Sequence, residues 1–154
     1  MLSSLVDGNS SSARLARVSG VCLDNFLAAS GVDWADIVKL DLEGAEPLAL
    51  AGARKALPSV RMLIFEANKP QLQRLAISPV ELVERTAAAG RFDTVSFIDE
   101  RSEKVCCWKP RDFEEALNAY KFINVVCKKS CSAEDQSSPP LQSAVPSNAR
   151  GMSK

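Results

Sequence analysis

Apolar positions between residues 36 and 66 change from a continuous run to a helical spacing and back again. The first run holds Ile37, Val38 and Leu40, and such a run with β-branched residues is typical of a buried strand. The second run covers residues 60–65 and predicts another strand, ended by Glu66. Between them, small and apolar residues recur at helical spacing up to Pro58: Ala45, Leu48, Ala49, Gly52, Ala53, Ala56 and Leu57. The pattern predicts two parallel strands joined by a helix in a right-handed crossover.

Acidic residues gather where these two strands are expected to end. Asp41, Glu43 and Glu46 follow the first strand, and Glu66 closes the second. In open α/β sheets, ligands bind beyond the carboxyl ends of the strands, so these side chains predict a ligand-facing rim. For Glu43 and Glu46 a second interpretation stays open, because acids at a helix N-terminus also stabilise the helix dipole. Lys39 is interpreted as a strand-edge or ion-pair residue, since nothing near it indicates an activated amine.

Further elements are predicted on both sides of this unit by periodicity and by start and stop residues. An apolar helical spacing from Leu23 predicts a helix that ends at Gly31, with Asp24 as its expected cap. A capping box at residues 78–81 starts another helix, which Gly90 ends. The remaining expected elements are a strand at 15–22, a helical turn at 71–75, hairpin strands at 92–98 and 105–108, a helix from Pro110 and a strand at 122–127.

Length and composition indicate one folded domain in a chain of 154 residues that is 46% hydrophobic. We expect a flexible segment at residues 1–15, the domain at 16–128 and a disordered Ser/Pro-rich tail at 129–154. The net charge is zero and no basic run is interleaved with aromatic residues, so no nucleic-acid partner is expected. No signal-like segment and no bilayer-spanning apolar run is visible, which predicts a cytoplasmic protein.

The chain contains five cysteines and no histidine. The lack of histidine excludes Ser-His and Cys-His nucleophile systems and His-ligated metal sites, so no metal is expected. The adjacent Cys106 and Cys107 allow two interpretations: a redox pair, or two small apolar residues of a strand, which we favour.

Four ordered segments resemble the signature of FkbM-type methyltransferases. They are Leu23-Asp24, KLDLEGAE at residues 39–46, LAGA at residues 50–53, and Phe65-Glu66. The resemblance covers roughly residues 18–126. It implies transfer of a methyl group from S-adenosylmethionine to an oxygen of a small molecule or sugar. It further implies that Asp41 contacts the cofactor or the substrate, that Glu43 or Glu46 helps to deprotonate the acceptor, and that Glu66 faces the substrate.

The resemblance also implies that half of the usual fold is missing. The chain's seven glycines include no G-x-G pair, whereas the family binds its cofactor with a glycine-rich turn in the first half of the domain. The expected fold is therefore α/β, a partial Rossmann-like sheet of strands four to seven, with the strand at 37–40 left as an open edge. That edge predicts self-association or a partner. The alternative is an inactive fragment that serves, if at all, as an interaction module.

Overall fold

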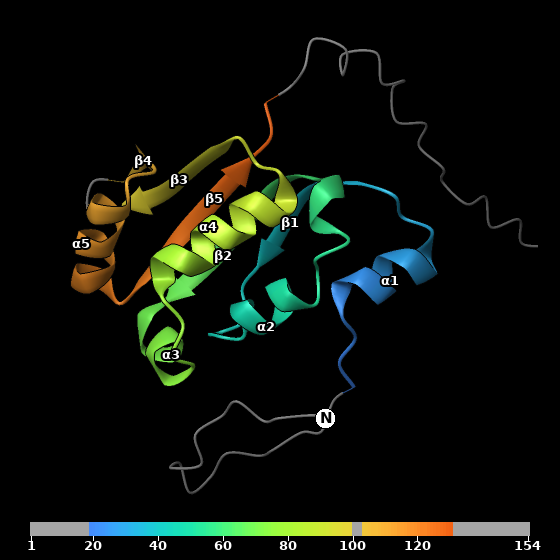
Figure 1. The fold of residues 1–154 in the computed structure, drawn as a ribbon, viewed down its shortest axis with the longest axis horizontal. Coiled ribbons are helices and arrows are strands. Elements are labelled where there is room, and N and C mark those ends of the chain that lie inside the picture. Colours follow the sequence, from blue (N-terminus) through green and yellow to red (C-terminus); the bar gives the residue numbers. More distant parts are fainter. Residues whose placement is uncertain (1–18, 100–102, 131–154) are drawn as a thin grey trace, which may run out of the picture.

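Five strands form one mixed sheet in the computed structural model, which describes residues 19–99 and 103–130 (Figure 1). The strands are β1 (Ala35–Leu40), β2 (Val60–Asn68), β3 (Thr94–Asp99), β4 (Lys104–Cys107) and β5 (Phe122–Lys128). Their order across the sheet is β1-β2-β5-β3-β4. Among neighbouring strands of this sheet, β1 and β2 form the one parallel pair, and the pairs β2–β5, β5–β3 and β3–β4 are antiparallel. The predicted parallel pairing of the two strands and the predicted hairpin are confirmed.

Residues 19–99 and 103–130 also form five α-helices and one 3-10 turn. They are α1 (Leu23–Ser30), α2 (Glu46–Ala51), the 3-10 turn η1 (Leu57–Ser59), α3 (Lys69–Arg74), α4 (Pro79–Gly90) and α5 (Pro110–Tyr120). Figure 1 shows α4 lying across the sheet. Alternate residues on one face of β2 and β5 are completely buried: Leu63, Phe65, Ala67, Ile123, Val125 and Cys127. From α5, Phe113 meets Phe97 of this face edge to face, with ring centroids 5.7 Å apart.

The connection between β1 and β2 differs from the single helix that the spacing predicts. Helix α2 ends at Ala51, Gly52 follows it, and the chain turns again before η1. Pro58 explains part of this break, because inside an α-helix its ring would clash with the carbonyl four residues earlier and its hydrogen bond would be lost. The predicted continuous helix up to Pro58 is therefore wrong, although Pro47 does lie in the first turn of α2 as expected.

Strand β2 also runs further than predicted, because it continues past Glu66 to Asn68. The extra residues are held by β5, where Asn124 lies opposite Glu66 and Phe122 lies opposite Asn68. Strand β1, in contrast, stops at Leu40, which pairs with Phe65. The prediction that Glu66 ends its strand is wrong, yet Glu66 still lies one position beyond the paired end of β1.

The N-terminal part of the described chain corrects two further predictions. Residues 19–22 form no strand, and the rest of the predicted strand at 15–22 lies outside the described residues. Cys22 takes the capping position of α1, and Asp24 does not cap this helix. Instead, Asp24 Oδ1 accepts hydrogen bonds from the backbone N–H groups of Lys55 (3.0 Å) and Ala56 (2.8 Å). Because Asp24 sits in the first turn of α1, its carboxylate fastens α1 to the turn before η1.

The other helix boundaries follow the sequence signals. Gly31 ends α1 with a left-handed φ of 63°. Ser78 caps α4 by accepting a hydrogen bond from Glu81 N–H at 3.3 Å. Gly90 is the last residue of α4, and Arg91 takes the left-handed conformation behind it. The predicted short helix near residues 71–75 appears as α3, which begins two residues earlier.

Residues beyond β5 stay attached to the sheet as far as the structure describes them. Lys129 N–H donates to the Arg61 carbonyl at 2.9 Å, and Ser130 N–H donates to Asp93 Oδ2 at 2.7 Å. The expected segment at 1–15 and most of the expected tail at 129–154 lie outside the described residues. Within the described part, no helix is long and apolar enough to cross a membrane.

Replacement of Asp24 by alanine tests the link between α1 and the η1 turn. We expect Asp24→Ala to lower the free energy of unfolding by about 1–3 kcal/mol, because two backbone donors lose a charged acceptor. Asp24→Asn, which keeps an acceptor oxygen, should lose less. The control is Asp33→Ala at an exposed position, which should change little. Urea denaturation followed by circular dichroism measures all three, and equal losses for Asp24→Ala and Asp33→Ala would contradict the assignment.

Candidate functional site

A tight turn follows β1 and carries the first acids of the candidate site. Ala45 N–H donates to the Leu42 carbonyl at 3.1 Å, and the two central residues have positive φ, 51° at Glu43 and 97° at Gly44. Positive φ at both central residues is the mark of a type I′ turn. A Cβ atom at Gly44 would lie only 2.7 Å from Gln71 Cγ, so glycine is required both for the backbone and for packing against α3.

Glu46 lies beneath this turn and is completely buried. Its Oε1 accepts a hydrogen bond from Leu42 N–H at 2.6 Å, while its buried Oε2 has no hydrogen-bond partner within the described residues. Burial of a carboxylate is costly unless hydrogen bonds or charges compensate it. The Glu46 side chain therefore supports the turn from its buried side, whereas Glu43 is exposed to solvent.

Glu66 is half-buried on β2 and lies within electrostatic reach of the other three acids. Burial raises the pKa of Glu66 most, and the charges of Glu46, Glu43 and Asp41 raise it further. Asn68 opposes these effects, because its Nδ2 donates to Glu66 Oε1 at 3.3 Å. The fold thus brings together all four acids that the sequence predicts for the rim, from β2 and from the segment that follows β1.

Asp41 lies at the exposed end of the rim and is paired with Lys39. The Lys39 Nζ atom lies 2.8 Å from Asp41 Oδ2, and both side chains are more than half exposed. The hydrogen bond to Asp41 and its charge raise the pKa of Lys39, so this amine stays protonated. The interpretation of Lys39 as an ion-pair residue is confirmed, and an exposed pair of this kind contributes little to stability.

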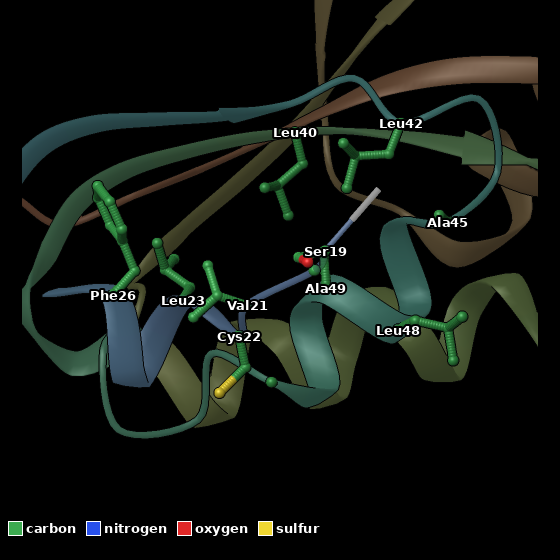
Figure 2. Close-up of a pocket in the computed structure, with 12 residues that line it drawn as sticks. Ser19, Val21, Cys22, Leu23, Phe26, Leu40, Leu42, Ala45, Leu48 and Ala49 are labelled. Atoms are coloured by element: carbon green, nitrogen blue, oxygen red, sulfur yellow. The ribbon is translucent and has the colours of Figure 1, made fainter. Parts of the chain in front are cut away.

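An apolar groove begins where the acidic turn ends (Figure 2). It has a volume of about 830 Å³ and lies between β1, α2 and the segment that leads into α1. Figure 2 shows Leu40 and Leu42 facing Val21 and Leu23 across it, with Ala49 on the α2 side. The rim and the groove therefore share the segment after β1.

Two polar residues that support the site were missed in the sequence. Asn68 caps α3 by accepting from Gln71 N–H at 3.3 Å and also orients Glu66. The signal was present, because Asn followed two residues later by Pro70 is typical of a helix start. Gln71 packs against Gly44, and no local pattern predicts that contact because the two residues come from different elements.

Comparison with protein families gives one match. The family model described as Methyltransferase FkbM domain matches residues 3–104, about two-thirds of the chain. The match begins and ends earlier than the expected resemblance over 18–126, and it includes Asp41, Glu43, Glu46 and Glu66. Neither the curated proteins nor the solved structures include a match to the chain.

The described residues offer only part of a site for the cofactor that this domain implies, S-adenosylmethionine. The carboxylates of the rim suit its cationic groups. Gly44, the glycine of the rim, does not leave its backbone open to a ligand, because Gln71 occupies the adjacent space. The part of the rim that the structure describes therefore supplies carboxylates but no open glycine backbone for the cofactor. The described residues also contain no group of three His, Cys, Asp or Glu side chains placed to hold a metal ion.

The raised pKa of Glu66 predicts a pH-dependent effect of Glu66→Gln. Because the folded state holds the Glu66 proton more tightly than the unfolded state, the wild-type residue favours folding at low pH and loses that contribution as the pH rises through the folded pKa. We therefore expect the free energy of unfolding of Glu66→Gln, compared with that of wild type, to be higher at about pH 7 than at about pH 4. Urea denaturation at both values measures this, with Glu84→Gln as the exposed control. A difference that does not vary with pH would contradict the rim geometry.

Proposed function

Because the chain belongs to the FkbM methyltransferase family, we propose that it carries the acceptor side of an S-adenosylmethionine-dependent methyltransferase. Its substrate would be a hydroxyl oxygen of a small molecule or sugar. The observation that carries the proposal is the convergence of four carboxylates at the carboxyl end of β1, one of them half-buried with a raised pKa. Carboxylates with raised pKa values suit proton exchange with hydroxyl groups near neutral pH.

Each acid has a proposed part in this function. Asp41, exposed beside Lys39, would contact the cationic methionyl part of the cofactor or the substrate. For deprotonation of the acceptor the candidates are Glu43 or Glu46, of which Glu43 is exposed and Glu46 is buried beneath the turn. Glu66 would face the substrate from β2. When bound, S-adenosylmethionine would supply an electrophilic methyl group.

A second candidate function is a binding module without activity of its own. The incomplete fit to the cofactor favours it, and so does the edge position of β1 in the sheet. Ile37 in the middle of this strand is 60% exposed, and the apolar groove adjoins Leu40. An unpaired strand edge beside apolar surface is a template for pairing with another chain. We propose that strands one to three of a complete domain of this family would pair at this edge in an active enzyme.

Two measurements test the methyltransferase proposal. Isothermal titration of the chain with S-adenosylhomocysteine should give weak or no binding, and a low-micromolar dissociation constant, about −8 kcal/mol, would mean that a compensating cradle exists. Methyl transfer is then measured with isotope-labelled S-adenosylmethionine and hydroxylated acceptors, after adding the cofactor half of a complete family member.

In that assay we expect Asp41→Asn and Glu43→Gln to reduce turnover by about tenfold or more while leaving the free energy of unfolding within about 0.5 kcal/mol. Glu84→Gln on α4 is the matched control. If Asp41→Asn and Glu43→Gln lose stability as strongly as turnover, the two acids have a structural role instead. Absence of transfer under every condition would favour the binding module.

The open edge predicts self-association, which sedimentation at low micromolar concentration measures. We expect the wild-type chain to sediment above the mass of a monomer, and Ile37→Lys to shift it towards the monomer because a charge is placed in the middle of the edge. Val105→Lys is the matched control, since Val105 is 68% exposed on β4 at the opposite edge of the sheet. A compact wild-type monomer that binds no dye for apolar surface would contradict this prediction.

A further inference from the structure

Two acids of the rim, Glu46 and Glu66, are withdrawn from solvent, and they are held in different ways. We propose that Glu46 is a positioning residue, which fixes the turn after β1 from its buried place, and that Glu66 is the carboxylate that takes the proton of an acceptor hydroxyl. This inference rests on the proposed function and assigns the proton transfer to a different residue of the same site.

Glu46 is poorly placed to take a proton from a substrate. Its side chain is completely buried, and Oε1 is occupied by a hydrogen bond of 2.6 Å from Leu42 N–H. A short hydrogen bond to a carboxylate is among the stronger ones in proteins. The second oxygen is also buried, so a substrate could reach it only if the turn opened. The burial that removes Glu46 from the substrate makes it effective as a fixed support.

The support acts on the residues that carry Asp41 and Glu43. Leu42 is the first residue of the turn, directly after Asp41, and its N–H donates to Glu46 in a part-buried hydrogen bond. The turn is held a second time at Gly44, which packs against Gln71 of α3. With both contacts in place, the backbone between β1 and α2 has one defined path, and the charge of Glu46 remains at a fixed place near Glu66.

Glu66 has the features that Glu46 lacks. It stands on β2 between the fully buried Phe65 and Ala67, opposite Asn124 of β5, so its backbone is rigid. Its side chain is half-buried, and Asn68 orients Oε1 at 3.3 Å. The charged groups around it are Lys39 and Asp41 from the end of β1, Glu43 from the turn and Glu46 from α2.

These surroundings raise the proton affinity of Glu66. Partial burial raises its pKa most, the hydrogen bond from Asn68 opposes this, and the charges of Glu46, Glu43 and Asp41 raise the pKa further. In the proposed step the proton leaves the acceptor hydroxyl and binds a Glu66 oxygen. Glu66 becomes neutral and the negative charge passes to the acceptor oxygen. A rigid, half-buried carboxylate of raised proton affinity suits this transfer better than the exposed Asp41, which is held by Lys39.

The experiment uses the full chain and needs neither cofactor nor acceptor. The carboxyl carbon of Glu66 is titrated by NMR in wild type and in Glu46→Gln, and the exchange rate of the Leu42 amide is measured in wild type, Glu46→Gln and Glu46→Ala. We expect Glu46→Gln to lower the pKa of Glu66 while keeping Leu42 protected, because the amide retains an acceptor oxygen. Glu46→Ala should speed Leu42 exchange by about tenfold or more, as expected for the loss of one part-buried hydrogen bond. The control Glu84→Gln should change neither quantity.

The outcomes separate this inference from the proposed function. A pKa of Glu66 that is unchanged in Glu46→Gln would overturn it, and so would unchanged Leu42 exchange in a folded Glu46→Ala. If Glu46→Ala does not fold, the titration of Glu46→Gln still decides. In the complemented methyl-transfer assay, Glu66→Gln should lose at least about tenfold in turnover and Glu66→Asp should recover part of it. If the NMR experiments give the expected results but no methyl transfer is detected, Glu46 is still a positioning residue and the methyltransferase proposal is rejected.

Discussion

The parallel pairing of β1 with β2 is the constraint on which the candidate site depends. The pairing ends at Leu40 and Phe65, whereas β2 continues beside β5 to Asn68. This offset leaves the chain after β1 free to turn just where β2 still presents Glu66. Backbone pairing with β5 keeps that part of β2 in the sheet. The rim is thus produced by two neighbouring strands of unequal length.

Electrostatics at the rim follows from the same offset. The turn after β1 brings Asp41 and Glu43 to the end of the strand, and α2 places Glu46 under the turn. Glu66 then has three carboxylates nearby, and the hydrogen bond from Asn68 stabilises its charge. The alternative interpretation, in which Glu46 stabilises the helix dipole, explains little of its position. Helix α2 has only six residues, and the Glu46 carboxylate accepts a hydrogen bond from Leu42, which lies outside the helix.

The open side of the sheet connects the two candidate functions. Strand β1 is an edge with the exposed Ile37 in its middle, and the groove beside it is lined by Leu40, Leu42 and residues of α1 and α2. A strand added in parallel beside β1 would bring its own carboxyl end to the acidic rim, because parallel strands end at the same edge of a sheet. The surface that would bind another chain is therefore also the surface that would complete a ligand site.

The sequence by itself determined the local elements and the position of the acids along the chain. The apolar runs at residues 37–40 and 60–65 and the start and stop signals at Ser78 and Gly31 act over a few residues, so periodicity and capping chemistry predict them. The tertiary structure alone decided the rest. The length of β2 depends on its pairing with β5. Asp24 accepts hydrogen bonds from the backbone of Lys55 and Ala56. Gln71 fills the space beside Gly44. Burial separates Glu46 from Glu43, although both follow the same strand. These features depend on contacts between distant segments, and a one-dimensional pattern carries no information on which segments meet.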